Sequence, residues 1–204
     1  MLQYQTIEPG TLQLLKSLQS MPMFQGLRLV GGTGLALQLG HRKSIDLDFF
    51  GTIEADSLEI REALEESHVV SIVKESKNIH IYMIDGVKVD IVNYRYTWID
   101  EPVIDSEITL ASIKDIAAMK IAAVIGRGTK KDFIDIDILL RSFSLQELLD
   151  LYMQKYPDGS LFIAMKSLTY FKDAESDPMP FMFEDTDWDD VKARIREAVI
   201  QLGF

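Results

Sequence analysis

The chain of 204 residues contains no cysteine, so neither a disulfide framework nor a thiolate zinc site can form. It has no apolar run long enough to span a membrane, and its opening "MLQYQTIEPG" lacks the basic-then-apolar layout of a signal peptide. We therefore expect a cytoplasmic protein that does not engage a membrane. Basic residues are outnumbered, with 21 Lys and Arg against 32 Asp and Glu and a formal net charge of −11. This balance argues against an extended positively charged surface for nucleic acid, but it is compatible with a local basic patch.

The commoner glycine motifs for phosphate binding are also missing. The dinucleotide-binding pattern G-x-G-x-x-G/A fits in neither register, because Leu37 or Thr33 stands where a small residue is required. The phosphate loop G-x-x-x-x-G-K-S/T occurs nowhere in the sequence. A calcium loop that begins at Asp46 fails as well, since Phe50 and Ser57 stand where oxygen ligands belong.

The hydrophobic spacing predicts an α/β half, residues 1–105, followed by a helical half, residues 106–204. In the first half we expect helices at 8–19, 33–40 and 56–67, strands at 27–30 and 44–50, and a hairpin at 78–94. In the second half we expect helices at 110–125, 132–143, 144–156, 160–171 and 188–204, with a loop at 172–187. No repeat or low-complexity tract interrupts this order.

Three local signals support these elements. Asp85 and Gly86 form a favoured two-residue hairpin turn between two alternating runs. Ser144 is followed three residues later by Glu147, which is the pattern of a capping box. Two close glycines at 126 and 128 favour a helix break, after which Thr129 can cap a new helix.

Acidic residues within apolar strands are the most unusual feature of the first half. If residues 44–50 form a strand, Asp46 and Asp48 present carboxylates on one side roughly 7 Å apart, while Ile45 and Leu47 face a core. Asp90 adds a third acid from the hairpin, and an unpaired acid among apolar neighbours is costly to bury. Three carboxylates on adjacent strands suit Mg²⁺ or Mn²⁺ and in-line phosphoryl or nucleotidyl transfer.

A glycine pair lies between the preceding strand and the following helix. Gly31 and Gly32 let backbone amides approach a triphosphate, and the helix dipole assists that contact. Each feature alone has an ordinary explanation, since most D-x-D pairs are solvated strand faces and a glycine pair before a helix is often a tight turn. Arg42 and Lys43 are compatible with plain surface cations, although their position just before the acids suits an anionic substrate.

The combination of these motifs resembles the AbiEii/AbiGii toxin family of the DNA polymerase β-like nucleotidyltransferase superfamily. The similarity rests on "GGTGLALQLGHRKSIDLDFF", which has the pattern G-G-S/T, a short helix, H-R-x-S and D-x-D-hydrophobic. It extends over roughly residues 27–140 through "DIAAMK" and "RGTKKDFIDIDILL" and does not assign the helices from about 141. The downstream residues that match are Asp115, Lys120, Arg127, Lys131, Asp132 and Asp135.

The resemblance implies a nucleotidyltransferase fold. Together with the hydrophobic pattern, we expect an α+β class: a nucleotidyltransferase-like mixed sheet with flanking helices, followed by a helical C-terminal domain that completes the active-site cleft. The resemblance also implies magnesium, NTP as donor, the 3′ end of tRNA as acceptor in some members, and a cognate antitoxin. The expected metal ligands are Asp46, Asp48 and Asp90, with Asp90 also a candidate base. The expected nucleotide-binding residues are Gly31, Gly32, Thr33, Arg42, Ser44, Lys120 and Lys131. Arg127, Asp132 and Asp135 are expected to position the cations or the acceptor.

Lys120 is the best single candidate for a phosphate-binding and catalytic cation, because it lies in the apolar "AAMKIAAV" and not on a polar face. Without the resemblance, the segment 114–131 reads equally well as a solvated loop with capping acids. Two rival functions stay open. One is nucleotidyl transfer to a small molecule of the aminoglycoside type, which the negative charge suits. The other is a non-catalytic nucleotide- or antitoxin-binding module.

Overall fold

The computed structural model describes residues 1–203, which form two compact units. The first unit contains residues 1–40, 44–95 and 102–111, and the second contains 41–43, 96–101 and the chain from 112 onward. The expected boundary after residue 105 thus falls inside the first unit. It lies between two strands of a hairpin, and the second of these strands also pairs with the sheet of that unit.

The first unit is a mixed sheet with helices. Its helices are α1 (Pro9–Ser20), α2 (Gly31–Leu39) and α3 (Ser57–Glu65), with short 3₁₀ turns at Tyr4–Thr6 and Pro22–Phe24. Its strands are β1 (Leu27–Leu29), β2 (Leu47–Gly51), β3 (Val70–Glu75), β4 (Ile79–Ile84), β5 (Val87–Asn93), β6 (Val103–Asp105) and β7 (Ile108–Leu110). The strand order is β3-β4-β5-β2-β1-β7-β6. β2 runs parallel to β5, and β1 parallel to β7, while the other neighbours are antiparallel. The predicted α+β class with a mixed sheet is confirmed.

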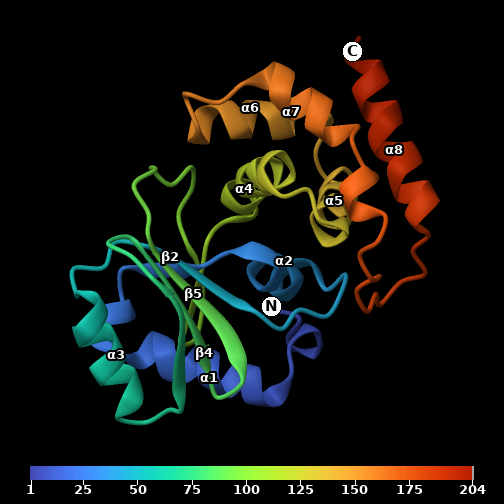
Figure 1. The fold of residues 1–204 in the computed structure, drawn as a ribbon. Coiled ribbons are helices and arrows are strands. Elements are labelled where there is room, and N and C mark those ends of the chain that lie inside the picture. The colour runs from blue at the N-terminus through green and yellow to red at the C-terminus, as the bar shows by residue number, and fades with distance from the viewer. Residues whose placement is uncertain (204) are drawn as a thin grey trace. The chain divides into compact units, whose positions relative to one another are not determined.

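The core of the first unit lies where α1 and α3 pack on the sheet. In Figure 1 both helices lie on the same side of β2, β4 and β5. Leu15 and Leu18 of α1 and Ile60 of α3 belong to the same buried cluster as Leu47 and Phe49 of β2. The alternation of β2 therefore fixes one face of this strand to the core and leaves the other for polar residues.

The predicted hairpin is confirmed, since Asp85 and Gly86 join β4 to β5 with φ angles of 50° and 83°. Positive φ at both turn residues is what a type I′ turn requires. The expectation that the chain turns helical from about residue 106 is wrong for Ile108–Leu110, which forms β7. The sequence analysis predicted no strand at β3, β6 or β7. β3 is largely exposed and shows no alternation, and β6 and β7 have three residues each.

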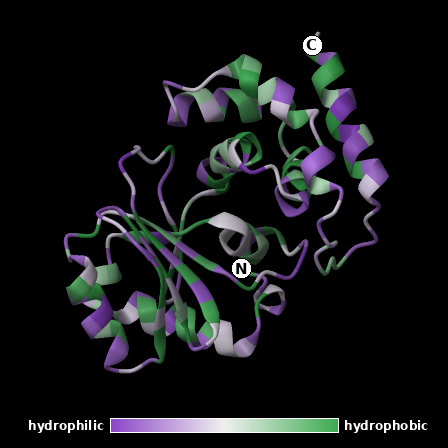
Figure 2. Cartoon of the chain, in the orientation of Figure 1, coloured by the Kyte–Doolittle hydropathy of each residue, from purple (hydrophilic) through white to green (hydrophobic). Residues whose placement is uncertain are grey.

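The second unit is helical, as expected. Its helices are α4 (Ile113–Gly126), α5 (Lys130–Leu139), α6 (Leu145–Lys155), α7 (Leu161–Leu168) and α8 (Trp188–Gln201), with a 3₁₀ turn at Lys172–Ala174. α8 buries Val191, Ile195 and Val199, which recur every four residues, and Figure 2 shows hydrophilic residues along the same helix. Within residues 1–203 no helix is long and apolar enough to cross a membrane.

Two predicted helix boundaries of this unit are also confirmed. Ser144 and Glu147 form the capping box that starts α6. α4 ends at Gly126, and Gly128 adopts a φ of +52° before Thr129 precedes α5. Glycine readily adopts this left-handed conformation, which explains the break between α4 and α5.

Candidate functional site

Two acidic residues of the first unit lie side by side on its sheet. Asp48 of β2 is the register partner of Asp90 of β5 in a parallel pair. Both are half-buried, whereas Leu47 and Val89, one residue before each, are fully buried. Since side chains alternate across a strand, the two carboxylates leave the sheet on the face opposite to that core. Neighbouring strands are about 4.8 Å apart, so this face presents a close pair of hard oxygen donors.

The N-terminus of α2 lies directly against one of these acids. Val30 donates its backbone N–H to the Asp48 carbonyl oxygen at 2.8 Å. Gly31 follows with a φ of +66°, and a Cβ placed there would be 2.0 Å from Asp48 Oδ2. No side chain caps this helix at Val30, and the first N–H groups of a helix have no intrahelical acceptor. The first turn of α2, residues 31–33, therefore offers amides suited to an anion beside the Asp48 carboxylate.

Gly31→Ala is expected to damage this arrangement. The added Cβ must displace the Asp48 side chain, and a non-glycine residue at positive φ costs roughly 1–2 kcal/mol. A misplacement of about 1 Å at reacting groups lowers a rate by up to about 100-fold, so we expect a loss of this order in pyrophosphate release from NTP. Gly10→Ala is the matched control, because a Cβ at Gly10 meets no atom within 4 Å. Equal activity of the two variants would contradict a role for Gly31.

The segment before β2 differs from its prediction. β2 begins at Leu47, so Asp46 lies one residue outside the strand. Ile45, expected to face the core, is 63% exposed, because the alternation does not extend back to it. The buried hydroxyl of Thr33 lies within hydrogen-bond distance of Ser44 Oγ (2.8 Å) and of the Asp46 carbonyl oxygen. Thr33 and Ser44 thus tie α2 to the segment that leads to Asp48, and their roles in nucleotide binding stay predictions.

The acidic residues at this site are the kind of ligand that magnesium prefers, but fewer of them lie together than expected. Asp48 and Asp90 supply adjacent carboxylates, the ligand type that Mg²⁺ prefers. Within residues 1–203, however, no three His, Asp or Glu side chains lie close enough together to hold one metal ion. Lys88 Nζ lies 2.5 Å from Asp90 Oδ1 and provides the positive charge there. Sequence reasoning missed Lys88, although its position two residues before Asp90 on a strand was the available signal.

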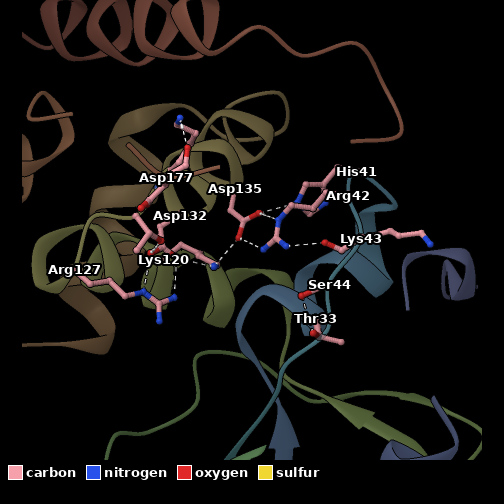
Figure 3. A network of polar contacts seen from close by, with 12 residues as sticks. Thr33, His41, Arg42, Lys43, Ser44, Lys120, Arg127, Asp132, Asp135 and Asp177 are labelled. Carbon is pink, nitrogen blue, oxygen red and sulfur yellow. Dashed lines mark hydrogen bonds and ion pairs between the residues drawn. The ribbon is translucent and has the colours of Figure 1, made fainter. Parts of the chain in front are cut away.

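The second unit contains a buried ion-pair network centred on Asp135 of α5 (Figure 3). Asp135 accepts hydrogen bonds from Arg42 Nε at 2.8 Å and Arg42 Nη2 at 2.9 Å. His41 Nε2 lies 2.8 Å from Asp135 Oδ1, and Lys120 Nζ lies 2.6 Å from Oδ2. Burial alone would raise the pKa of Asp135, but the charges of Arg42 and Lys120 outweigh it and hold this pKa well below its usual value.

Asp132 extends the network to the end of α4. Its carboxylate accepts from Arg127 Nε at 2.8 Å, Arg127 Nη2 at 2.9 Å and Thr129 Oγ1 at 2.6 Å. Lys120 Nζ lies 3.0 Å from Asp132 Oδ1, so one ammonium joins Asp132 to Asp135. Burial again acts to raise the pKa of Asp132, and the Arg127 hydrogen bonds and the Lys120 charge lower it overall.

The structure thus brings together five of the residues that the sequence analysis selected. Arg42, Lys120, Arg127, Asp132 and Asp135 form one connected network. Lys120, expected to meet phosphate, is 3% exposed and lies between two carboxylates. Its direct contact with a substrate stays a prediction, and so do the substrate roles of Arg42 and Lys131.

Two further buried lysines have structural contacts. Lys130 donates to the carbonyl oxygens of Glu175 and Asp177, which anchors the connection between α7 and α8. Lys155 of α6 is 1% exposed, with its Nζ 2.7 Å from Asp115 Oδ1. Sequence reasoning missed Lys155, since it lies at the end of an ordinary amphipathic helix and no local signal marks it.

Comparison with known proteins assigns the chain to a family. The model described as "Nucleotidyl transferase AbiEii toxin, Type IV TA system" matches residues 13–201, so the match includes the helices after residue 141. An uncharacterised protein of Aquifex aeolicus (strain VF5) is 34% identical over 195 residues, which cover 92% of this chain and 93% of that protein.

Solved structures show the same fold. JHP933 from Helicobacter pylori has a TM-score of 0.60 and 20% identity, covering 96% of this chain and 93% of its own. MenT4, a nucleotidyltransferase toxin from Mycobacterium tuberculosis H37Rv, has a TM-score of 0.60 and 15% identity, covering 93% of this chain and 80% of its own. The family match, together with the motifs around Asp48 and Asp135, shows that this chain belongs to the AbiEii family of toxins and is a nucleotidyltransferase.

Proposed function

We propose that this chain transfers a nucleoside monophosphate from NTP to a hydroxyl of RNA, with the 3′ end of tRNA as acceptor, in a reaction that depends on Mg²⁺ or Mn²⁺. One observation carries the proposal. Asp48 and Asp90 are neighbours on β2 and β5, and the first turn of α2 lies against Asp48 through Gly31. Adjacent carboxylates beside unsatisfied helix amides are suited to a metal–triphosphate group.

In the proposed reaction, the acceptor hydroxyl oxygen bonds to the α-phosphorus of NTP. The bond between that phosphorus and its bridging oxygen breaks, and pyrophosphate leaves with the electron pair. Asp90 accepts the proton of the attacking hydroxyl, and the amides of Gly31, Gly32 and Thr33 bind phosphate oxygens. Asp48 and Asp90 would hold magnesium, which when bound would neutralise phosphate charge and make the hydroxyl more acidic. Asp46, one residue before β2, is the expected third ligand.

An RNA acceptor requires cations in a chain whose net charge is −11. Within the segment 114–131, Lys120 and Lys130 lie in buried contacts, so the more exposed Arg127 and Lys131 are better candidates than these two for contacts with RNA phosphates. Lys131 follows the start of α5, and the Arg127 side chain is 57% exposed. With few phosphate contacts, the affinity for RNA should fall with salt along a modest slope.

Membership of the family also supports the proposal of an antitoxin partner and a cytoplasmic location. A toxin of this family is expected to have a cognate antitoxin, and NTP and tRNA would be met in the cytoplasm. The net charge of −11 favours a rival acceptor, a cationic small molecule of the aminoglycoside type. The family match argues against the other function left open by the sequence, a module that binds nucleotide or antitoxin without catalysis.

The test is incubation of the full chain with each labelled NTP, Mg²⁺ and total RNA. We expect label in a tRNA-sized RNA, release of pyrophosphate, and loss of both when a chelator removes the metal. Transfer to an aminoglycoside with no label in RNA would replace the proposed acceptor. Thermal stabilisation by NTP without pyrophosphate release, over a broad panel of acceptors, would exclude the enzymatic proposal.

A further inference from the structure

The second unit contains a cavity of about 360 Å³ between the α4–α5 turn and the C-terminal end of α7. Its volume falls in the range of small-ligand sites, about 300–1,000 Å³. The residues that line it and bear on its chemistry are Gly126, Arg127, Lys166, Ser167, Tyr170 and Asp173. The cavity is thus defined by residues of one unit alone.

The residues that line this cavity carry a net positive charge, whereas the whole chain is negatively charged. Arg127 and Lys166 contribute two cations against the single carboxylate of Asp173, whereas the whole chain carries −11. Asp132 holds the Arg127 guanidinium through two hydrogen bonds, so this cation is oriented before a ligand arrives. Lys166 lies on the exposed side of the last turn of α7. The pair suits an anionic group such as a phosphate.

An exposed aromatic ring lies beside these cations. Tyr170 is 52% exposed and its hydroxyl lies 3.4 Å from Asp173 Oδ1. Phe162 and Lys166 lie four residues apart on one face of α7, and Tyr170 follows two residues after the helix ends at Leu168. Proteins that bind single-stranded nucleic acid combine this kind of stacking ring with cations that contact the backbone.

We propose that this cavity binds one nucleotide of the RNA acceptor. The base stacks on Tyr170, Arg127 and Lys166 contact the phosphate, and the Ser167 hydroxyl is placed for the ribose or a phosphate oxygen. Asp173 accepts from an exocyclic amine of the base, which favours A, C or G over U. The inference rests on the proposed RNA acceptor and gives Lys166, Ser167 and Tyr170 a role in binding it.

The experiment measures binding of the full chain to a single-stranded RNA of about 12 nucleotides, a length within the site sizes of such proteins. Tyr170→Ala should weaken RNA binding about 5- to 100-fold, the range of one base stacked on one ring. Tyr170→Phe keeps the ring and should bind within about twofold of the wild type. The affinity for NTP should be the same in all three proteins.

A second experiment reverses the charge of Lys166 and measures binding to the same RNA. Lys166→Glu should weaken RNA binding and reduce its salt dependence by about one phosphate contact. Lys77→Glu, at an exposed position between β3 and β4, is the control with the same change of net charge and should bind RNA as the wild type does. Equal binding by Tyr170→Ala and the wild type, or equal weakening by the two lysine reversals, would overturn the nucleotide site.

The two proposals fail in different ways. If the wild type labels RNA while the Tyr170 and Lys166 variants bind and label it equally well, the cavity proposal is wrong and the RNA acceptor stands. If the wild type binds no RNA and transfers only to a small molecule, the RNA acceptor is wrong and the cavity proposal falls with it.

Discussion

Asp48→Asn is expected to lower nucleotidyl transfer by about 100-fold or more, the scale on which enzymes lose rate with one electrostatic catalytic group. The amide keeps the shape of the carboxylate and removes its charge. Asp48 is half-buried on the polar face of β2, beside Asp90 and against Gly31. The substitution should therefore remove one metal-binding oxygen with little change in how the sheet packs.

The readouts are pyrophosphate release with NTP and acceptor, and the calorimetric affinity for Mn²⁺. Glu65→Gln, which removes an exposed acid at the end of α3, is the control for the change of net charge. We expect this control to keep both activity and metal affinity, and we expect both variants to melt as the wild type does. Full activity of Asp48→Asn would remove Asp48 from the catalytic site.

Features governed by neighbours in the sequence could be predicted from the sequence. The Asp85–Gly86 turn is one example, because only its two residues must adopt positive φ. The start of α3 is another, since Asp56 accepts from the backbone N–H groups of Leu58 and Glu59. In each case the atoms that decide the conformation lie within a few residues of one another.

Features governed by distant partners could not be predicted in this way. β7 has three residues and is a strand because it pairs with β1, about 80 residues earlier in the chain. Lys155 is the last residue of α6, and nothing in the sequence of this helix indicates that its ammonium pairs with Asp115 of α4. A buried charge is tolerable only with its partner in place, and that partner is set by the tertiary fold.

The candidate site shows both situations. Gly31, Asp48 and Asp90 could be selected from the sequence because an acid in an apolar strand and a glycine before a helix are locally unusual. The parallel pairing of β2 with β5 puts Asp48 opposite Asp90 and is a long-range property. Lys120 was selected for the same apolar surroundings that in the structure enclose it with Asp132 and Asp135.

Asp135→Ala is expected to destabilise the second unit by about 3–5 kcal/mol, the scale for breaking a buried ion pair by removing one partner. Asp135 is fully buried and balances Arg42 and Lys120, each 3% exposed. Without the carboxylate, these two cations remain buried with less negative charge around them. Both tryptophans of the chain, Trp98 and Trp188, belong to this unit, so denaturation followed by tryptophan fluorescence reports its unfolding.

The control is Glu184→Ala, which removes the acid of an exposed pair with the same close approach, Arg141 to Glu184 at 2.6 Å. Exposed pairs contribute little to stability, so the denaturation midpoint of Glu184→Ala should stay near that of the wild type.

The stability of the second unit at acidic pH gives an independent check. The pKa values of Asp132 and Asp135 are lower in the folded state than the unfolded value of about 3.9, so the folded state binds fewer protons. Their contribution to stability is complete above that value and is lost as the pH falls below it. The wild type should therefore lose more stability between about pH 5 and pH 2 than Asp135→Ala does. Equal acid sensitivity of the two proteins would show that the charge of Asp135 does not stabilise this unit.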